Sequence, residues 1–243
     1  HLDILLIYFF YGLGFFTMGL VMILEVSRLP KLASVSLLIP LGGFGLLHGI
    51  HDWLEIFLLQ LVWLGSEIPA WVSNIRLTLL TISFLFLLAY GLRTRQNNPD
   101  AGIQAKFPGY LVLGIYLVFI IFNAYSSILK NPINTFHMID VLVRYLLAVP
   151  AAALAFLGLR EQSRGFRAQK RLDLANSMTM VAIGFGIYAF TQLFVPPIDM
   201  FPARYINSEV FLSGMGFPIQ LIRALVALIV MTGMLKAVTL VEK

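Results

Sequence analysis

The sequence contains no cysteine, which excludes disulfide bonds, iron–sulfur clusters, thiolate metal sites and cysteine nucleophiles. Charge is also scarce: charged residues make up 12% of the chain and hydrophobic residues 59%. Soluble domains carry about 25% charged and roughly 45–50% apolar residues. The mean hydropathy is +0.88. A surface with so little charge does not suit water, and we therefore expect the lipid bilayer to be the solvent of this chain.

Long apolar runs indicate an all-α fold, a polytopic membrane bundle of seven transmembrane helices in a single domain, residues 1–243. A helix needs about 20 apolar residues to cross the bilayer core, and helices satisfy every backbone polar group within lipid. Seven such helices use nearly the whole chain and leave little for a soluble catalytic domain. We expect them at about residues 3–26, 34–63, 71–93, 109–129, 138–159, 174–194 and 210–236.

The basic residues predict the orientation of the bundle. Most of the 17 lie in the connections after the first, third and fifth helices and in the C-terminal tail, with the densest run at 160–171. Cytoplasmic loops are enriched in Lys and Arg. The pattern therefore places the N-terminus outside and the C-terminus in the cytoplasm, which requires an odd number of crossings. The net charge of +5 reflects these loops and not nucleic-acid binding.

The second predicted helix carries a stripe of ionisable side chains. His48, His51, Asp52 and Glu55 are spaced i, i+3, i+4 and i+7, so they project from one face of the helix. Ionisable groups are costly inside a membrane and usually mark a site or a pathway. The stripe therefore predicts that something polar is bound or paired there.

Three arginines in or near other predicted helices can face this stripe. Arg76, Arg144 and Arg223 belong to the third, fifth and seventh helices, and a buried arginine needs a carboxylate, a carbonyl dipole or a ligand anion. One interpretation is a ligand pocket between the second, third, fifth and seventh helices that opens outward. The alternative is purely structural: Asp52 and Glu55 would pair with Arg144 and Arg223 to fix the helix register.

The histidines suggest three kinds of occupant. Haem b is the first, because imidazole binds iron and arginines suit propionates. His48 and His51 share a helix and cannot occupy opposite axial positions. The second ligand would then be His137, with Met138 or an open position as the alternatives. A transition-metal ion is the second, held by these histidines with Asp52 and Glu55. The third is quinone or proton chemistry with His51 and Glu55 as titrating groups.

Three stretches resemble the N-terminal membrane regions of bacterial sensor histidine kinases. They are FGLLHGIHDW at 44–53, RYLLAVP at 144–150 and GFPIQLIRAL at 216–225. The resemblance implies a sensory input module in the bacterial inner membrane, expected to be a homodimer. It also implies a cytoplasmic output domain after residue 243, a kinase or sometimes a diguanylate cyclase.

The resulting hypothesis is a transmembrane sensory module, with no enzymatic activity in this segment. A cofactor or small ligand, with haem b as the leading candidate, would bind in the outer half of the bundle. The seventh helix would relay the change to the cytoplasm. The rival classes are a membrane redox protein that handles haem or quinone, and a metal-sensing or transport protein.

Overall fold

The computed structural model describes residues 2–28, 35–95 and 132–241, and these residues form helices and short connections without a β-strand. The prediction of an all-α fold is therefore confirmed for the part of the chain that is described. The helix expected at about 109–129 lies outside the described residues. The elements are α1 (Leu2–Arg28), α2 (Val35–Trp63), α3 (Ala70–Arg95), α5 (Pro132–Val143), the π-helix η1 (Arg144–Ala148), α6 (Val149–Ala168), α7 (Leu172–Thr191), α8 (Ser208–Met215) and α9 (Ile219–Val241).

Length and composition support a membrane protein. Five described helical segments are long and apolar enough to cross a bilayer: Asp3–Glu25, Ala70–Thr94, Thr135–Ala168, Leu172–Thr191 and Ile219–Leu240. The helix α2 has 29 residues and is not among these five segments, and it carries the stripe of histidines and carboxylates. The polar stripe thus sits in a helix with the dimensions of a span.

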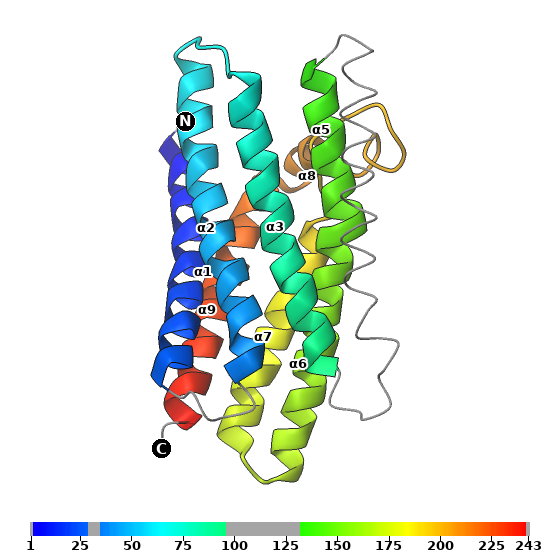
Figure 1. The fold of residues 1–243 in the computed structure, drawn as a ribbon. Coiled ribbons are helices and arrows are strands. Elements are labelled where there is room, and N and C mark those ends of the chain that lie inside the picture. The colour runs from blue at the N-terminus through cyan, green and yellow to red at the C-terminus, as the bar shows by residue number, and fades with distance from the viewer. Residues whose placement is uncertain (1, 29–34, 96–131, 242–243) are drawn as a thin grey trace.

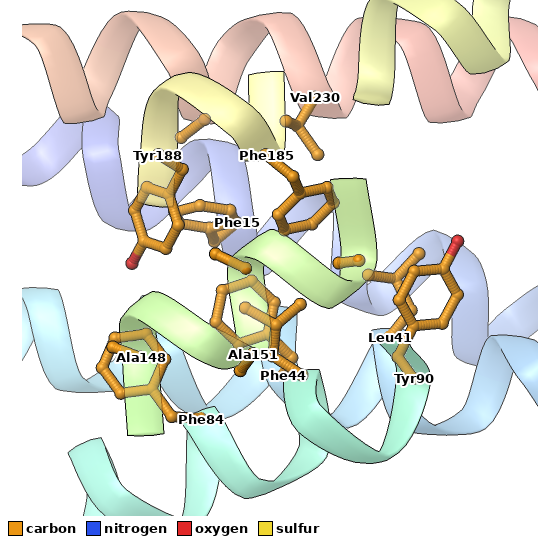
Figure 2. Packing of buried hydrophobic residues seen from close by; sticks show 14 of the residues in the cluster. Phe15, Leu41, Phe44, Phe84, Tyr90, Ala148, Ala151, Phe185, Tyr188 and Val230 are labelled. Atoms are coloured by element: carbon orange, nitrogen blue, oxygen red, sulfur yellow. The ribbon is translucent and has the colours of Figure 1, made fainter. Parts of the chain in front are cut away.

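The long helices form a ring. α1 packs against α2, α2 against α3, α3 against α6, α6 against α7, α7 against α9, and α9 returns to α1. The helices α1, α2 and α3 alternate in direction, as do α6, α7 and α9, whereas α3 and α6 run in the same direction, as do α9 and α1 (Figure 1). The N- and C-terminal ends lie at opposite ends of the bundle. Aromatic side chains from four helices fill the middle of the ring: Phe15, Phe44, Phe84 and Phe185 are fully buried (Figure 2). The functional residues must therefore fit around an aromatic core.

Glycines bring α1 and α2 into backbone contact. A Cβ atom at Gly45 would lie 2.5 Å from the carbonyl oxygen of Phe15 and 2.7 Å from the Cα of Gly19. A Cβ at Gly49 would lie 2.7 Å from the carbonyl oxygen of Gly12. Small residues permit this close approach of helices in membranes. The contact holds the polar stripe of α2 at a fixed position relative to α1.

The fifth predicted span has wrong boundaries. Instead of 138–159, one helical segment runs from Pro132 to Ala168 and includes the π-helix η1. The N–H of Val149 donates to the carbonyl of Arg144, an i to i+5 bond, and Pro150 has no N–H with which to continue the regular α pattern. The π-helix begins at Arg144, one of the predicted site residues.

The last predicted span, 210–236, is also wrong because it joins two separate helices. α8 ends at Met215, the next residue Gly216 has a φ of 78° in the left-handed region, and Pro218 precedes α9. The connection between α7 and α8 packs against α5 through a cluster that includes Val141, Val195 and Ala203. This connection forms part of the same end of the bundle as the α2–α3 turn (Figure 1).

Candidate functional site

The ionisable stripe of α2 faces the interior of the ring. His48, His51 and Asp52 are each at most 2% exposed, and Glu55 is partly buried. His48 lies directly on the aromatic core: its ring stacks on Phe44 with a centroid distance of 5.1 Å and lies 5.0 Å from the ring of Phe84. The sequence prediction that these residues share an inward face is confirmed. The stripe begins where the apolar core ends.

His48 is bonded at both ring nitrogens. Its Nε2 lies 2.6 Å from the hydroxyl of Tyr188 and 3.1 Å from the hydroxyl of Tyr11, and these two hydroxyls are 2.9 Å apart. Its Nδ1 lies 3.0 Å from Oγ of Ser83. The imidazole therefore joins α2 to α1, α3 and α7, and an axial bond from His48 to a haem iron would require one of these contacts to break.

The bonding pattern assigns the tautomer of His48. Oγ of Ser83 donates its only hydrogen to the carbonyl of Leu80, 2.7 Å away, so it accepts from the histidine. The proton then sits on Nδ1, and Nε2 accepts from a tyrosine hydroxyl. In this arrangement His48 is a neutral structural junction.

A chain of ion pairs connects neighbouring helices across the ring. Nη1 of Arg76 on α3 lies 2.7 Å from Oε1 of Glu55 on α2 and 3.0 Å from Oδ2 of Asp140 on α5. Oδ1 of Asp140 accepts from Nε of Arg144 at 2.6 Å, and Nη1 of Arg144 donates to Oε1 of Gln192 at 2.8 Å. These contacts link α2, α3, the segment formed by α5 and η1, and the C-terminal end of α7.

The predicted pairing of carboxylates with arginines differs from the pairing observed. Glu55 pairs with Arg76, and Arg144 pairs with Asp140. Asp52 instead lies beside His51, with Oδ1 3.4 Å from Nδ1 of the imidazole. The alternative in which Asp52 and Glu55 pair with Arg144 and Arg223 is therefore wrong, because Asp140 and Arg76 occupy those positions.

Arg223 on α9 has a different environment from the other two arginines. Its Nη2 donates to the carbonyls of Thr191 and Phe194, at 2.8 and 2.9 Å, at the C-terminal end of α7. The negative end of a helix dipole favours a cation at this position. Arg223 is 5% exposed, its Nε has no hydrogen-bond partner, and it forms no ion pair with a carboxylate of the described residues.

Two adjoining cavities border these side chains. The larger has a volume of about 1120 Å³ and opens at the end of the bundle that carries the α2–α3 turn. The smaller lies against it and has room for about one water molecule. Both are lined by Tyr8, Glu55, Arg144 and Arg223, and the smaller is also lined by Tyr11, His48, His51 and Asp52. The larger cavity therefore leads down to the polar stripe of α2.

The structure places five of the eight predicted site residues on the larger cavity: Glu55, Arg76, His137, Arg144 and Arg223. Arg76, Arg144 and Arg223 all line the larger cavity, as predicted. His137 also lines it, but His48 and His51 border the smaller cavity and not the larger one. Over residues 2–28, 35–95 and 132–241, no group of three or more His, Asp or Glu side chains could hold a metal ion. The predicted set of three histidines does not form a metal centre there.

Sequence reasoning missed several members of the site. Asp140 carries two of the ion pairs, and its position four residues before Arg144 on a helix was an available signal. Gln192, Ser83 and Tyr188 are single polar residues in apolar runs, and no spacing distinguishes them. Their roles depend on how the helices are rotated in the ring.

Comparison of the chain with family models, with curated proteins and with solved structures gave no match.

Proposed function

We propose that this chain is the sensory input module of a bacterial membrane signalling protein, with a sensor histidine kinase as the expected type. The observation that carries the proposal is the larger cavity, about 1120 Å³, which opens at one end of the bundle and converges on three arginines. Small-molecule sites are concave, mostly apolar and supplied with a few convergent polar groups. The cavity has these properties, so its occupant is a small molecule.

The contacts at the base of the cavity provide a route for relay. Arg223 belongs to α9, and it holds the C-terminal end of α7 through two carbonyls. α9 continues past α1 and α7 to the opposite end of the bundle (Figure 1). If these helices have two arrangements, a ligand that binds one of them more tightly would increase the population of that arrangement. α9 would carry that shift toward the output domain.

The proposed topology has seven spans with the cavity facing outward. α3 ends and α5 begins at opposite ends of the bundle (Figure 1), as a crossing at about 109–129 requires. The basic residues of α6 and of the α6–α7 turn lie at the end away from the cavity. The positive-inside rule makes that end cytoplasmic.

Haem b remains a prediction for the occupant, with quinone as the alternative. An optical spectrum of the purified protein tests it directly. A Soret band that disappears in His51→Ala would support haem, whereas a colourless protein after haem-supplemented expression would contradict it.

The proposed pocket can be tested by filling it. Ser73 lines the larger cavity, and the adjacent Asn74 is exposed and does not. Ser73→Trp should abolish the thermal stabilisation that the small-molecule fraction of the host membranes gives to the purified protein, while Asn74→Trp should retain it. An equal response in both variants, or no stabilisation of the unaltered protein, would contradict a small-molecule site in this cavity.

A further inference from the structure

The pairing of charged side chains around the larger cavity indicates the class of its occupant, if the cavity is a ligand site as proposed above. Two of its three arginines are neutralised by protein groups: Arg76 contacts Glu55 and Asp140, and Arg144 contacts Asp140. Arg223 has no carboxylate within ion-pair distance among the residues that the structure describes. It is the arginine whose charge is met only by carbonyl dipoles.

Burial makes this imbalance significant. Arg223 is 95% buried, since only 5% of its surface is exposed, and it lines both cavities. Removing a cation from water is expensive unless hydrogen bonds and opposite charge replace the hydration shell. Two carbonyls supply part of this, while Nε has no partner. Within the part of the chain that the structure describes, no carboxylate therefore compensates the buried charge of Arg223 directly.

The larger cavity is lined by apolar side chains as well as by the arginines. Leu58, Leu59, Phe136 and Phe194 line it together with polar groups, so an apolar body can be covered while a charged group reaches the arginines. The guanidinium fork suits carboxylate and phosphate groups in particular.

We propose that the larger cavity binds an organic anion with an apolar body, whose carboxylate or phosphate group is recognised by Arg223 with Arg144 beside it. The anion enters from the aqueous phase at the end of the bundle where the cavity opens. Glu67 also lines the larger cavity, but it is exposed to solvent. Asp52 is a buried carboxylate that opposes this binding. It borders the smaller cavity with Arg223 and lies beside His51, outside ion-pair distance of the arginine.

Octanoate is a suitable probe, with octanol and octylammonium as matched compounds of neutral and opposite charge. Binding is measured by calorimetry on the protein in phosphatidylcholine nanodiscs, with Ser73→Trp as the blocked reference. Octanoate should bind saturably and the other two should not compete. Equal binding of octanol and octanoate to the unaltered protein would overturn the proposal.

Substitutions then locate the anion. Arg223→Gln should weaken octanoate binding by about tenfold or more, the size expected for losing a hydrogen bond to a charged group. Arg204→Gln, at an exposed arginine paired with Asp199, should leave it unchanged. Asp52→Asn should strengthen binding because it removes a competing negative charge. Unchanged affinity for octanoate in Arg223→Gln would contradict the assignment of Arg223 as the anion-binding residue. If that variant does not fold, the comparison of octanoate, octanol and octylammonium on the unaltered protein tests whether the cavity binds an anion.

Two further arms separate the possible sources and the possible failures. Phosphatidylglycerol in the nanodiscs should compete with octanoate if the natural anion is a lipid headgroup, and should have no effect if it is a soluble molecule. The membrane-derived fraction could stabilise the unaltered protein but not Ser73→Trp, while octanoate binds no better than octanol. That result would support a small-molecule site in the cavity and contradict the proposal that its occupant is an anion.

Discussion

At the scale of single residues, two kinds of polar contact hold the site together, and they differ in cost. The ion pairs of Asp140 place one carboxylate between two arginines in a buried setting. The contacts of His48 are neutral hydrogen bonds to hydroxyl groups. Breaking a buried ion pair leaves a charge without compensation, whereas a lost hydrogen bond within a membrane bundle often finds a substitute. The ion-pair chain should therefore dominate the stability of the site.

Asp140→Asn should lower the free energy of unfolding by about 3–5 kcal/mol, because Arg76 and Arg144 would both lose a charged partner. The measurement is an SDS titration of the protein in mixed micelles. Asp199→Asn is the matched control, because Asp199 is exposed and lies 3.5 Å from the exposed Arg204. A similar decrease in the free energy of unfolding in both variants would show that the buried ion pairs of Asp140 contribute no more to stability than an exposed pair.

Tyr188→Phe should cost much less, about 0.6 kcal/mol and at most roughly 1.7, the range measured for hydrogen bonds in membrane bundles. Nε2 of His48 would still accept from Tyr11 at 3.1 Å. The double variant Tyr11→Phe/Tyr188→Phe should lose more than the sum of the two single variants, because only then is the nitrogen left without a partner. Strict additivity in the same titration would refute this account of the junction.

At the scale of helices, hydropathy predicted where most spans lie but not how they are interrupted. The residues 210–236 are mostly apolar, so their hydropathy alone does not separate α8 from α9. The break follows from the left-handed Gly216 and from Pro218, two local signals within an apolar run. The shared face of His48, His51 and Asp52 was predictable from spacing, because it depends on one helix alone. The partner of Glu55 was not, because it depends on the depth and rotation of α3.

The close contact of α1 and α2 gives a test at this scale. Gly45→Ala should destabilise the protein, since its Cβ would lie 2.5 Å from a backbone oxygen that belongs to the facing helix. Gly165→Ala makes the same substitution in α6, where a Cβ meets no atom within 4 Å. It should be neutral or slightly stabilising because alanine favours helix. Thermal denaturation of the two variants in detergent compares them, and equal midpoints would contradict the proposed contact.

At the scale of the whole molecule, the ring of helices has a polar end with the cavity and an opposite end with the basic residues. The orientation of the chain in the membrane stays a prediction, which loop charge can supply because that signal is additive along the sequence. The ring order and the cavity could not be predicted, because they depend on which helices pack together. The sensory role, the dimer and the output domain rest on the resemblance of three stretches to sensor histidine kinases.

The absence of cysteine makes the orientation directly testable. Ser66→Cys places a thiol in the α2–α3 turn, and Gln169→Cys places one in the α6–α7 turn at the opposite end. A membrane-impermeant maleimide should label Ser66→Cys in cells whose outer membrane is permeabilised and whose inner membrane is intact. It should label Gln169→Cys only after that membrane is opened. The reverse pattern would invert the proposed topology.

We propose that occupancy of the cavity changes the position of α9 at the cytoplasmic end. Nitroxide labels on Arg164→Cys in α6 and Thr239→Cys in α9, both exposed, report the separation of these helices by pulsed electron spin resonance. Adding the membrane-derived small-molecule fraction should shift the distance distribution, and Ser73→Trp in the same labelled protein should abolish the shift. A distribution that stays unchanged while the fraction binds, or that shifts equally with the cavity filled by tryptophan, would contradict the account.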